Sequence, residues 1–126
     1  MSIQKENLLA LADELSAGAT ETHWRSAVSR AYYAAYHGCN DWHTALPVPG
    51  SNSGQSGGVH QELINRLRNP DTATPIATRN LSKILASKLE VLRGQRGKAD
   101  YKLPETVDPV CAEQACELAK QILLKL

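Results

Sequence analysis

The sequence predicts an all-α fold, a compact antiparallel up-and-down bundle of four main helices and one short helix. Three observations support this prediction. Apolar residues recur at helical spacing along most of the chain, Pro, Asp and Thr residues stand where helices begin or end, and no stretch has a strand signal of comparable strength. The chain of 126 residues is long enough for one hydrophobic core and too short for two ordinary domains. We therefore expect a single domain over residues 1–126.

The first predicted helix spans residues 3–17 and ends at Gly18. The second has the strongest signal, because seven residues follow one another in steps of three or four and stay in one stripe for about six turns. These residues are Trp24, Val28, Ala31, Ala35, Cys39, Trp42 and Leu46. Thr20 or Thr22 is predicted to cap this helix, and Pro47 ends it. The result is a long central helix.

Residues 47–58 read PVPGSNSGQSGG and show no apolar periodicity. We expect a flexible surface loop that contributes nothing to the core. A short helix is predicted from about residue 59 to residue 68, where the turn sequence Asn-Pro-Asp at 69–71 ends it.

Two further helices begin at characteristic residue pairs. The Thr-Pro pair at 74–75 predicts a cap and a first helical residue, and this helix should fray near Gly94 or Gly97. Its predicted inner face consists of Ile76, Leu81, Ile84, Leu85, Leu89 and Leu92. The Asp-Pro pair at 108–109 starts the last helix in the same way. Its predicted inner face consists of Val110, Ala115, Leu118, Ala119, Ile122 and Leu126.

The composition excludes several classes of protein. Hydrophobic residues make up 42% and charged residues 21% of the chain, which argues against a disordered, collagen-like or membrane-dominated protein. Asp13 and Glu14 stand where a signal peptide needs apolar residues, so we expect a cytoplasmic protein without a membrane partner. The three cysteines lack the spacing of a metal site or a disulfide framework. We expect reduced thiols, no metal and no cofactor.

The net charge of +1 hides a segregation along the chain. Residues 66–102 contain nine Lys or Arg residues and three Asp or Glu residues, whereas residues 1–62 contain three basic and six acidic residues. A basic middle favours binding of a polyanion such as RNA, or of an acidic face of a partner. The same pattern is also typical of an ordinary solvated surface.

The second predicted helix carries the first group of candidate site residues. His23, Arg30 and His37 recur every seven residues and share a face, and Tyr33 lies beside them. An arginine and a histidine placed this way hold a phosphate and move a proton. The alternative is that Arg30 and Tyr33 tie neighbouring helices together and that the histidines are simply exposed.

The second group lies near the end of the helix that begins at Pro75. It consists of Arg93, Arg96, Lys98, Asp100, Tyr101 and Lys102. Arginine forks match phosphate oxygens and tyrosine stacks on a base, which favours a patch for phosphate or single-stranded nucleic acid. The alternative is structural, because Asp100 is a natural ion-pair partner for Arg30 or Arg96.

Two stretches together resemble the HEPN superfamily (higher eukaryotes and prokaryotes nucleotide-binding domain), in particular its small prokaryotic members. They are SRAYYAAYHGCNDW at residues 29–42 and LRGQRGKADY at residues 92–101. The resemblance implies a bundle of four to five helices, a homodimer and a nucleotidyltransferase partner in a toxin–antitoxin or defence system. It also implies ribonuclease-like chemistry, since many members are metal-independent ribonucleases. The polar positions of the family correspond here to Arg30, Tyr33, Arg93, Arg96, Asp100 and Tyr101.

The ribonuclease members carry an arginine, four to six further residues and a histidine, followed by a tyrosine. If Tyr101 corresponds to that tyrosine, Ala99 stands at the histidine position, and alanine cannot exchange a proton. We therefore expect a dimeric binding protein for RNA, a nucleotide or a partner protein. The predicted binding residues are Arg30, Tyr33, His37, Arg93, Arg96, Lys98, Asp100 and Tyr101.

Two alternatives stay open on the sequence. One is a metal-independent endoribonuclease, for which the candidate catalytic residues are Arg93, Arg96, His37 and Asp100. The other is a non-catalytic structural or antitoxin-like subunit that masks a nucleotidyltransferase.

Overall fold

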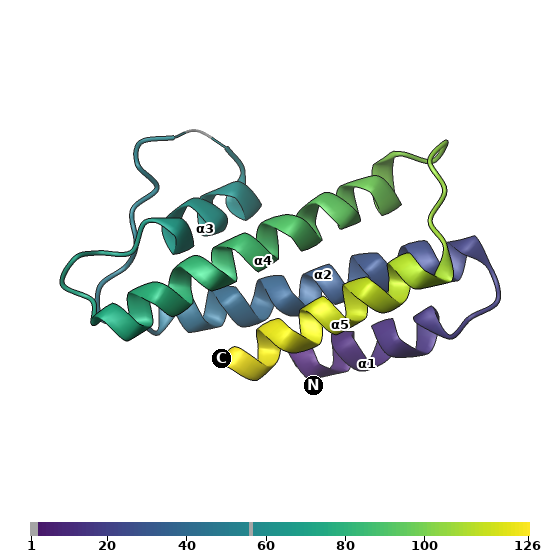
Figure 1. Ribbon diagram of the computed structural model, residues 1–126, viewed down its shortest axis with the longest axis horizontal. Helices are drawn as coiled ribbons and strands as arrows, with labels where there is room; N and C mark the ends of the chain where they lie inside the picture. Colours follow the sequence, from purple (N-terminus) through teal and green to yellow (C-terminus); the bar gives the residue numbers. More distant parts are fainter. Residues whose placement is uncertain (1–2, 56) are drawn as a thin grey trace.

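Five helices and no strand make up the computed structural model, which describes residues 3–55 and 57–126. The helices are α1 (Lys5–Ser16), α2 (Glu21–Thr44), α3 (Val59–Arg68), α4 (Ile76–Tyr101) and α5 (Pro109–Lys125). The four longer helices lie side by side and alternate in direction, and the short α3 packs on α4 (Figure 1). The predicted all-α bundle is confirmed. None of the helices in the described ranges has the length and apolar character to cross a membrane.

Helix α2 is the centre of the bundle and contacts all four other helices. Its N-cap is Thr20, whose hydroxyl accepts from the backbone N–H of His23. The predicted apolar stripe faces inward. Four of its members are covered by neighbouring helices (Val28, Ala31, Ala35 and Cys39), whereas Trp24, Trp42 and Leu46 are only partly buried.

The start and end of α4 differ from the prediction. Pro75 is the N-cap and Thr74 does not cap the helix, and α4 runs without a break through Gly94 and Gly97. The helix persists because the Arg25 guanidinium donates to the carbonyl groups of its last turn and of the chain that follows, including that of Ala99 at 2.9 Å. Glycine destabilises a helix interior, and the hydrogen bonds from Arg25 on α2 offset this cost.

The inner faces of α4 and α5 are rotated only slightly from the predicted ones, since Leu85, Leu89 and Leu92 on α4 and Ala115, Ala119 and Ile122 on α5 are buried as predicted. Ile76 and Ile84 on α4 are 61% and 44% exposed, and Val110 and Leu126 near the ends of α5 are 55% and 39% exposed. Small side chains outside the predicted faces are buried as well, namely Ser82, Ala86 and Ala99 on α4 and Ala112 and Cys116 on α5. The rotation follows from packing, since small residues let helix axes approach closely while long side chains fit at the margins.

The segment 47–58 does contribute to packing, and the contrary prediction is wrong at Gly50. This residue is buried, its N–H donates to His43 Nε2 at 3.0 Å, and its carbonyl accepts from Arg66 Nη1 at 2.8 Å. A Cβ atom at position 50 would lie 1.9 Å from the carbonyl oxygen of Arg66, so only glycine fits. Ser51 adds a backbone hydrogen bond to Asn69. The chain after α2 is therefore fastened to α3.

Candidate functional site

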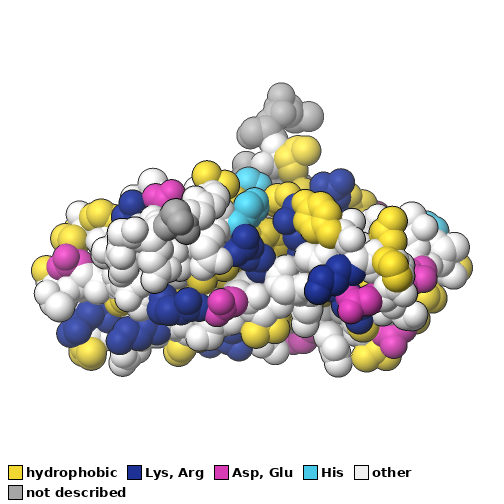
Figure 2. All heavy atoms as spheres, turned by 90° about the horizontal axis from the view of Figure 1, so that it is seen from above, with side chains coloured by type: hydrophobic (Ala, Val, Ile, Leu, Met, Phe, Trp, Pro, Cys, Tyr) yellow, Lys and Arg dark blue, Asp and Glu magenta, His cyan; other side chains and the backbone are white. Residues whose placement is uncertain are grey.

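Polar and aromatic residues of α2, α3 and α4 meet on one face of the bundle. We call this surface the arginine–tyrosine face, and it consists of Tyr33, Tyr36, His37, His60, Arg93, Arg96, Asp100 and Tyr101. Seen from above, histidine side chains lie directly beside Lys or Arg side chains near the middle of the molecule (Figure 2). The fold thus brings together most of the residues from both groups that the sequence singled out.

Arg96 is the centre of this face. Its Nη2 donates to the hydroxyl groups of Tyr33 at 2.9 Å and Tyr101 at 3.2 Å. Its Nε lies 2.8 Å from Asp100 Oδ2 in an ion pair, although this N–H is not aligned as a hydrogen bond. The guanidinium carbon lies 5.3 Å from the centroid of Tyr33 and 5.2 Å from that of Tyr101. Burial opposes the charged form of Arg96, but its contacts with these tyrosines and with Asp100 outweigh burial and raise its pKa.

Asp100 orients Arg96 from the same helix. Its Oδ2 also accepts from Ser29 Oγ at 3.2 Å, which links α4 to α2. Of the two arginines that the sequence offers as partners of Asp100, Arg96 forms the ion pair, but it does so within α4 and not across the bundle. Arg30 instead is exposed and lies at the edge of the face, in a depression that Ser29 and Asp100 also line.

His60 enters the face from α3. Its Nδ1 lies 2.7 Å from the hydroxyl of Tyr32, and its ring centroid lies 4.5 Å from that of Tyr36. Burial, followed by the charges of Arg96 and Arg93, lowers the pKa of His60, so its imidazole is neutral at pH 7. Burial raises the pKa of Tyr32 to about 12 against the opposing effect of the same two arginines. The pair is thus an uncharged phenol and an uncharged imidazole beside two cations.

Sequence reasoning missed His60, although a signal was present. Leu63, Ile64 and Leu67 follow it by three, four and seven residues, and all three are buried. A histidine at that spacing lies on the inward face of a short helix, where a polar side chain needs a partner. The partner is Tyr32, which the sequence does not single out because it stands among apolar residues.

Arg93 and His37 lie on either side of this centre. The Arg93 guanidinium donates to the side-chain oxygen of Gln61, which joins α4 to α3. The exposed ring of His37 lies 5.4 Å from that of Tyr36, at the end of the aromatic row. Both residues are therefore accessible at the rim of the arginine–tyrosine face.

Other candidate positions lie outside this face. Lys98 lines a small pocket on the α5 side of α4, with Val107 and Cys111. His23 lies at the start of α2, where its ring bonds to the Thr20 hydroxyl at 2.7 Å. Ala99 is 2% exposed and points into the core. A side chain at position 99 therefore does not reach Arg96, and the only imidazoles on the face are those of His37 and His60 among the described residues.

The face is suited to bind an anion. It offers two guanidinium groups and several phenol and imidazole donors, and a single carboxylate, that of Asp100, offsets part of the positive charge. Within residues 3–55 and 57–126, no three His, Cys, Asp or Glu side chains gather as metal ligands.

No protein-family model, curated protein or solved structure matches this chain. The resemblance to the HEPN superfamily rests on the two motifs at residues 29–42 and 92–101 and stays a prediction.

Proposed function

We propose that this protein binds RNA or a nucleotide through the arginine–tyrosine face. The observation that carries the proposal is the fixed orientation of Arg96, whose Nε and Nη2 are held by Asp100, Tyr33 and Tyr101. Among the described residues, no acceptor engages its Nη1 or the Nη2 of Arg93. Two guanidinium groups with donors to spare favour a phosphate ligand.

The aromatic rings support a nucleic acid over a simple anion. Tyr101 is 71% exposed beside Arg96, and Tyr36 and His37 continue the row on the other side. Bases stack on such rings with little regard to sequence. The predicted homodimer and nucleotidyltransferase partner stay predictions of the family resemblance.

Binding of a fluorescent single-stranded RNA over a range of salt concentrations tests this proposal. Arg93→Gln should weaken binding about tenfold, because a hydrogen bond to a charged group contributes about 1.5 kcal/mol or more. It should also reduce the slope of log affinity against log salt by about 0.7, the value for one phosphate contact on a single strand. Lys98→Gln is the matched control, since it removes the same charge on the opposite side of α4. Equal losses in both variants, or no binding by the wild type, would contradict the proposal.

The second candidate is a metal-independent endoribonuclease, which the neutral imidazole of His60 beside Arg93 and Arg96 favours. In this reaction His60 takes the proton from a 2′-hydroxyl, and the resulting oxygen attacks the adjacent phosphorus. The 5′-oxygen of the next nucleotide leaves with a proton that His37 supplies, which yields a 2′,3′-cyclic phosphate and a 5′-hydroxyl. The arginines stabilise the charge that develops on the phosphate.

Incubation of total RNA with the protein in EDTA tests this second candidate. Cleavage should be lost in His60→Gln and in Arg93→Ala, while the free energy of unfolding falls by no more than about 1 kcal/mol, the cost of losing the hydrogen bond between His60 and Tyr32. Cleavage that persists in His60→Gln excludes this histidine as the base, and absence of cleavage by the wild type leaves the binding function alone.

A further inference from the structure

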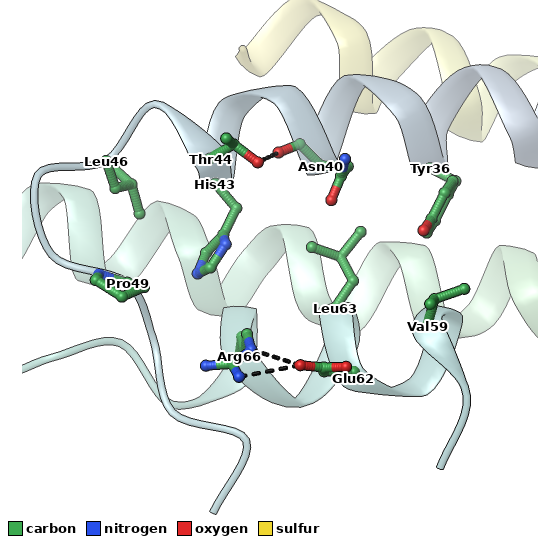
Figure 3. A pocket seen from close by; sticks show the side chains of 10 residues that line it. All are labelled: Tyr36, Asn40, His43, Thr44, Leu46, Pro49, Val59, Glu62, Leu63 and Arg66. Carbon is green, nitrogen blue, oxygen red and sulfur yellow. Dashed lines mark hydrogen bonds and ion pairs between the residues drawn. The ribbon is translucent and has the colours of Figure 1, made fainter.

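A pocket of about 590 Å³ opens between α2, α3 and the chain that follows α2 (Figure 3). This volume lies within the range of small-molecule sites. Apolar side chains line it from two segments, with Val59 and Leu63 on α3 and Leu46 and Pro49 after α2. Tyr36 forms part of one end of the pocket and also belongs to the arginine–tyrosine face, so the two sites adjoin.

His43 supplies a hydrogen-bond donor to this pocket. It is only 8% exposed, and the backbone N–H of Gly50 donates to its Nε2 at 3.0 Å. Because a backbone N–H can only donate, Nε2 is unprotonated and the neutral ring carries its proton on Nδ1. No hydrogen bond of the described residues uses this Nδ1–H, and the ring projects into the pocket (Figure 3).

Glu62 supplies an acceptor on the opposite wall. Its Oε1 accepts both from Nε of Arg66 at 3.1 Å and from Nη2 of Arg66 at 3.0 Å, which leaves Oε2 without a partner among the described residues. The side-chain amide of Asn40, which can both donate and accept, projects from α2 on the same wall as His43 (Figure 3). The pocket therefore offers a donor, an acceptor and an amide between apolar walls.

We propose that this pocket holds a purine base, so that the ligand of the arginine–tyrosine face is a purine nucleoside phosphate. This inference rests on the proposed function. A nucleobase has flat faces that pack against the apolar walls. Its edge carries both acceptors and N–H donors, which match the donor of His43, the acceptor of Glu62 and the amide of Asn40. A bicyclic purine covers more of these walls than a pyrimidine does.

The position of the pocket agrees with this assignment. The Tyr36 ring lies 4.5 Å from that of His60, and the α3 residue after His60 receives the Arg93 hydrogen bond. A nucleotide whose base occupies the pocket extends past Tyr36 and places its phosphate toward the arginines. The free nucleotide and the end of an RNA strand share this chemistry.

Calorimetric titration with AMP, GMP and ribose 5-phosphate tests the inference. The purine nucleotides should bind at least tenfold more tightly than ribose 5-phosphate, which has the phosphate but no base. Asn40→Phe fills the pocket from an exposed helical position and should abolish this difference. Asn80→Phe makes the same change at an exposed position on α4 and should preserve it. Glu62→Gln keeps the shape of the pocket and should reduce the preference even if Asn40→Phe proves unstable.

The outcomes separate the pocket from the face. Equal binding of ribose 5-phosphate and purine nucleotides overturns the base pocket and leaves phosphate binding intact. Failure of all these probes and of single-stranded RNA to bind overturns both. A 5′-phosphorylated oligoadenylate compared with AMP identifies the source, and in either case the affinity should fall in Asn40→Phe.

Discussion

Arg25 on α2 binds the C-terminal end of α4, the helix that carries Arg96. Replacing Arg25 tests whether this contact stabilises that end of the helix. Its Nη1 donates to the carbonyl groups of Lys98 at 3.2 Å and Ala99 at 2.9 Å, and its Nη2 donates to that of Leu103 at 3.2 Å. The side chain is 13% exposed and forms an ion pair with Glu21 as well. The Lys98 carbonyl also accepts from the backbone N–H of Lys102, but carbonyl groups at a helix end otherwise lack intrahelical donors, so the guanidinium acts as a cap and complements the negative end of the helix dipole.

The contacts of Arg25 set the size of the expected effect. A hydrogen bond from a charged donor contributes about 1.5–3 kcal/mol. Two terminal nitrogens share all these carbonyl groups, so Arg25→Met removes the equivalent of two such bonds, or about 3–6 kcal/mol. Water replaces part of this at the exposed carbonyl groups, so we expect a loss of about 3 kcal/mol in the free energy of unfolding. For a domain of this size the melting temperature should fall by about 10 °C.

Urea unfolding followed by circular dichroism measures this effect. Arg25→Lys keeps the charge without the fork and should lose about half as much. Arg30→Met is the control on the same helix, where the side chain is exposed and the change should stay within about 0.5 kcal/mol. A loss below about 1 kcal/mol in Arg25→Met would refute the capping role. Hydrogen exchange should also accelerate at residues 98–102, next to Arg96.

Three further predictions concern single side chains. Because burial, and then the charge of Arg66, lowers the pKa of His43, the folded state favours its neutral form; its contribution to stability should be complete above about pH 6.5 and decline at lower pH. Urea midpoints between pH 7.5 and 5 measure this decline, which should be smaller in His43→Asn. Tyr32→Phe removes the hydrogen bond to His60 and should cost about 1 kcal/mol of unfolding free energy, and no loss would show that this bond adds nothing. Gly50→Ala should unfold the protein or lower its melting temperature sharply, because a methyl group there meets the Arg66 carbonyl. Gly94→Ala has open space for its methyl group and should stabilise α4 by up to about 1 kcal/mol. Similar melting curves for the two variants would contradict the packing around Gly50.

Much of the fold could be predicted from local signals. The order of the five helices, the caps at Thr20 and Asp108 and the turn after Arg68 follow from the residues themselves. The rotation of α4 could not be predicted in this way, because Ser82 and Ala86 displace Ile84 from the core only when a neighbouring helix approaches closely. Hydrophobicity predicts which residue types are usually buried, whereas the shape of the neighbouring helices decides which side chains fit into the core.

The candidate site was predicted in part. Tyr33, Arg96, Asp100 and Tyr101 were singled out and lie together. Lys98 was singled out because it is basic and near in sequence, yet it points toward α5. Neighbours in a helical sequence lie on different faces, so proximity along the chain is a weak guide to proximity in space.

The sequence by itself determined that this chain forms five helices, where most of them begin, and which residue types are available for phosphate binding. These properties depend on spacing and on capping chemistry within a few residues, so they are local. Only the tertiary structure decided that His60 joins Arg93 and Arg96, that Gly50 fastens the chain after α2 to α3, and that a pocket adjoins the face. Tertiary contacts join residues far apart along the chain, from 7 positions for Gly50 and His43 to 63 for Tyr33 and Arg96, and their geometry depends on how the helices rotate to bury their small side chains.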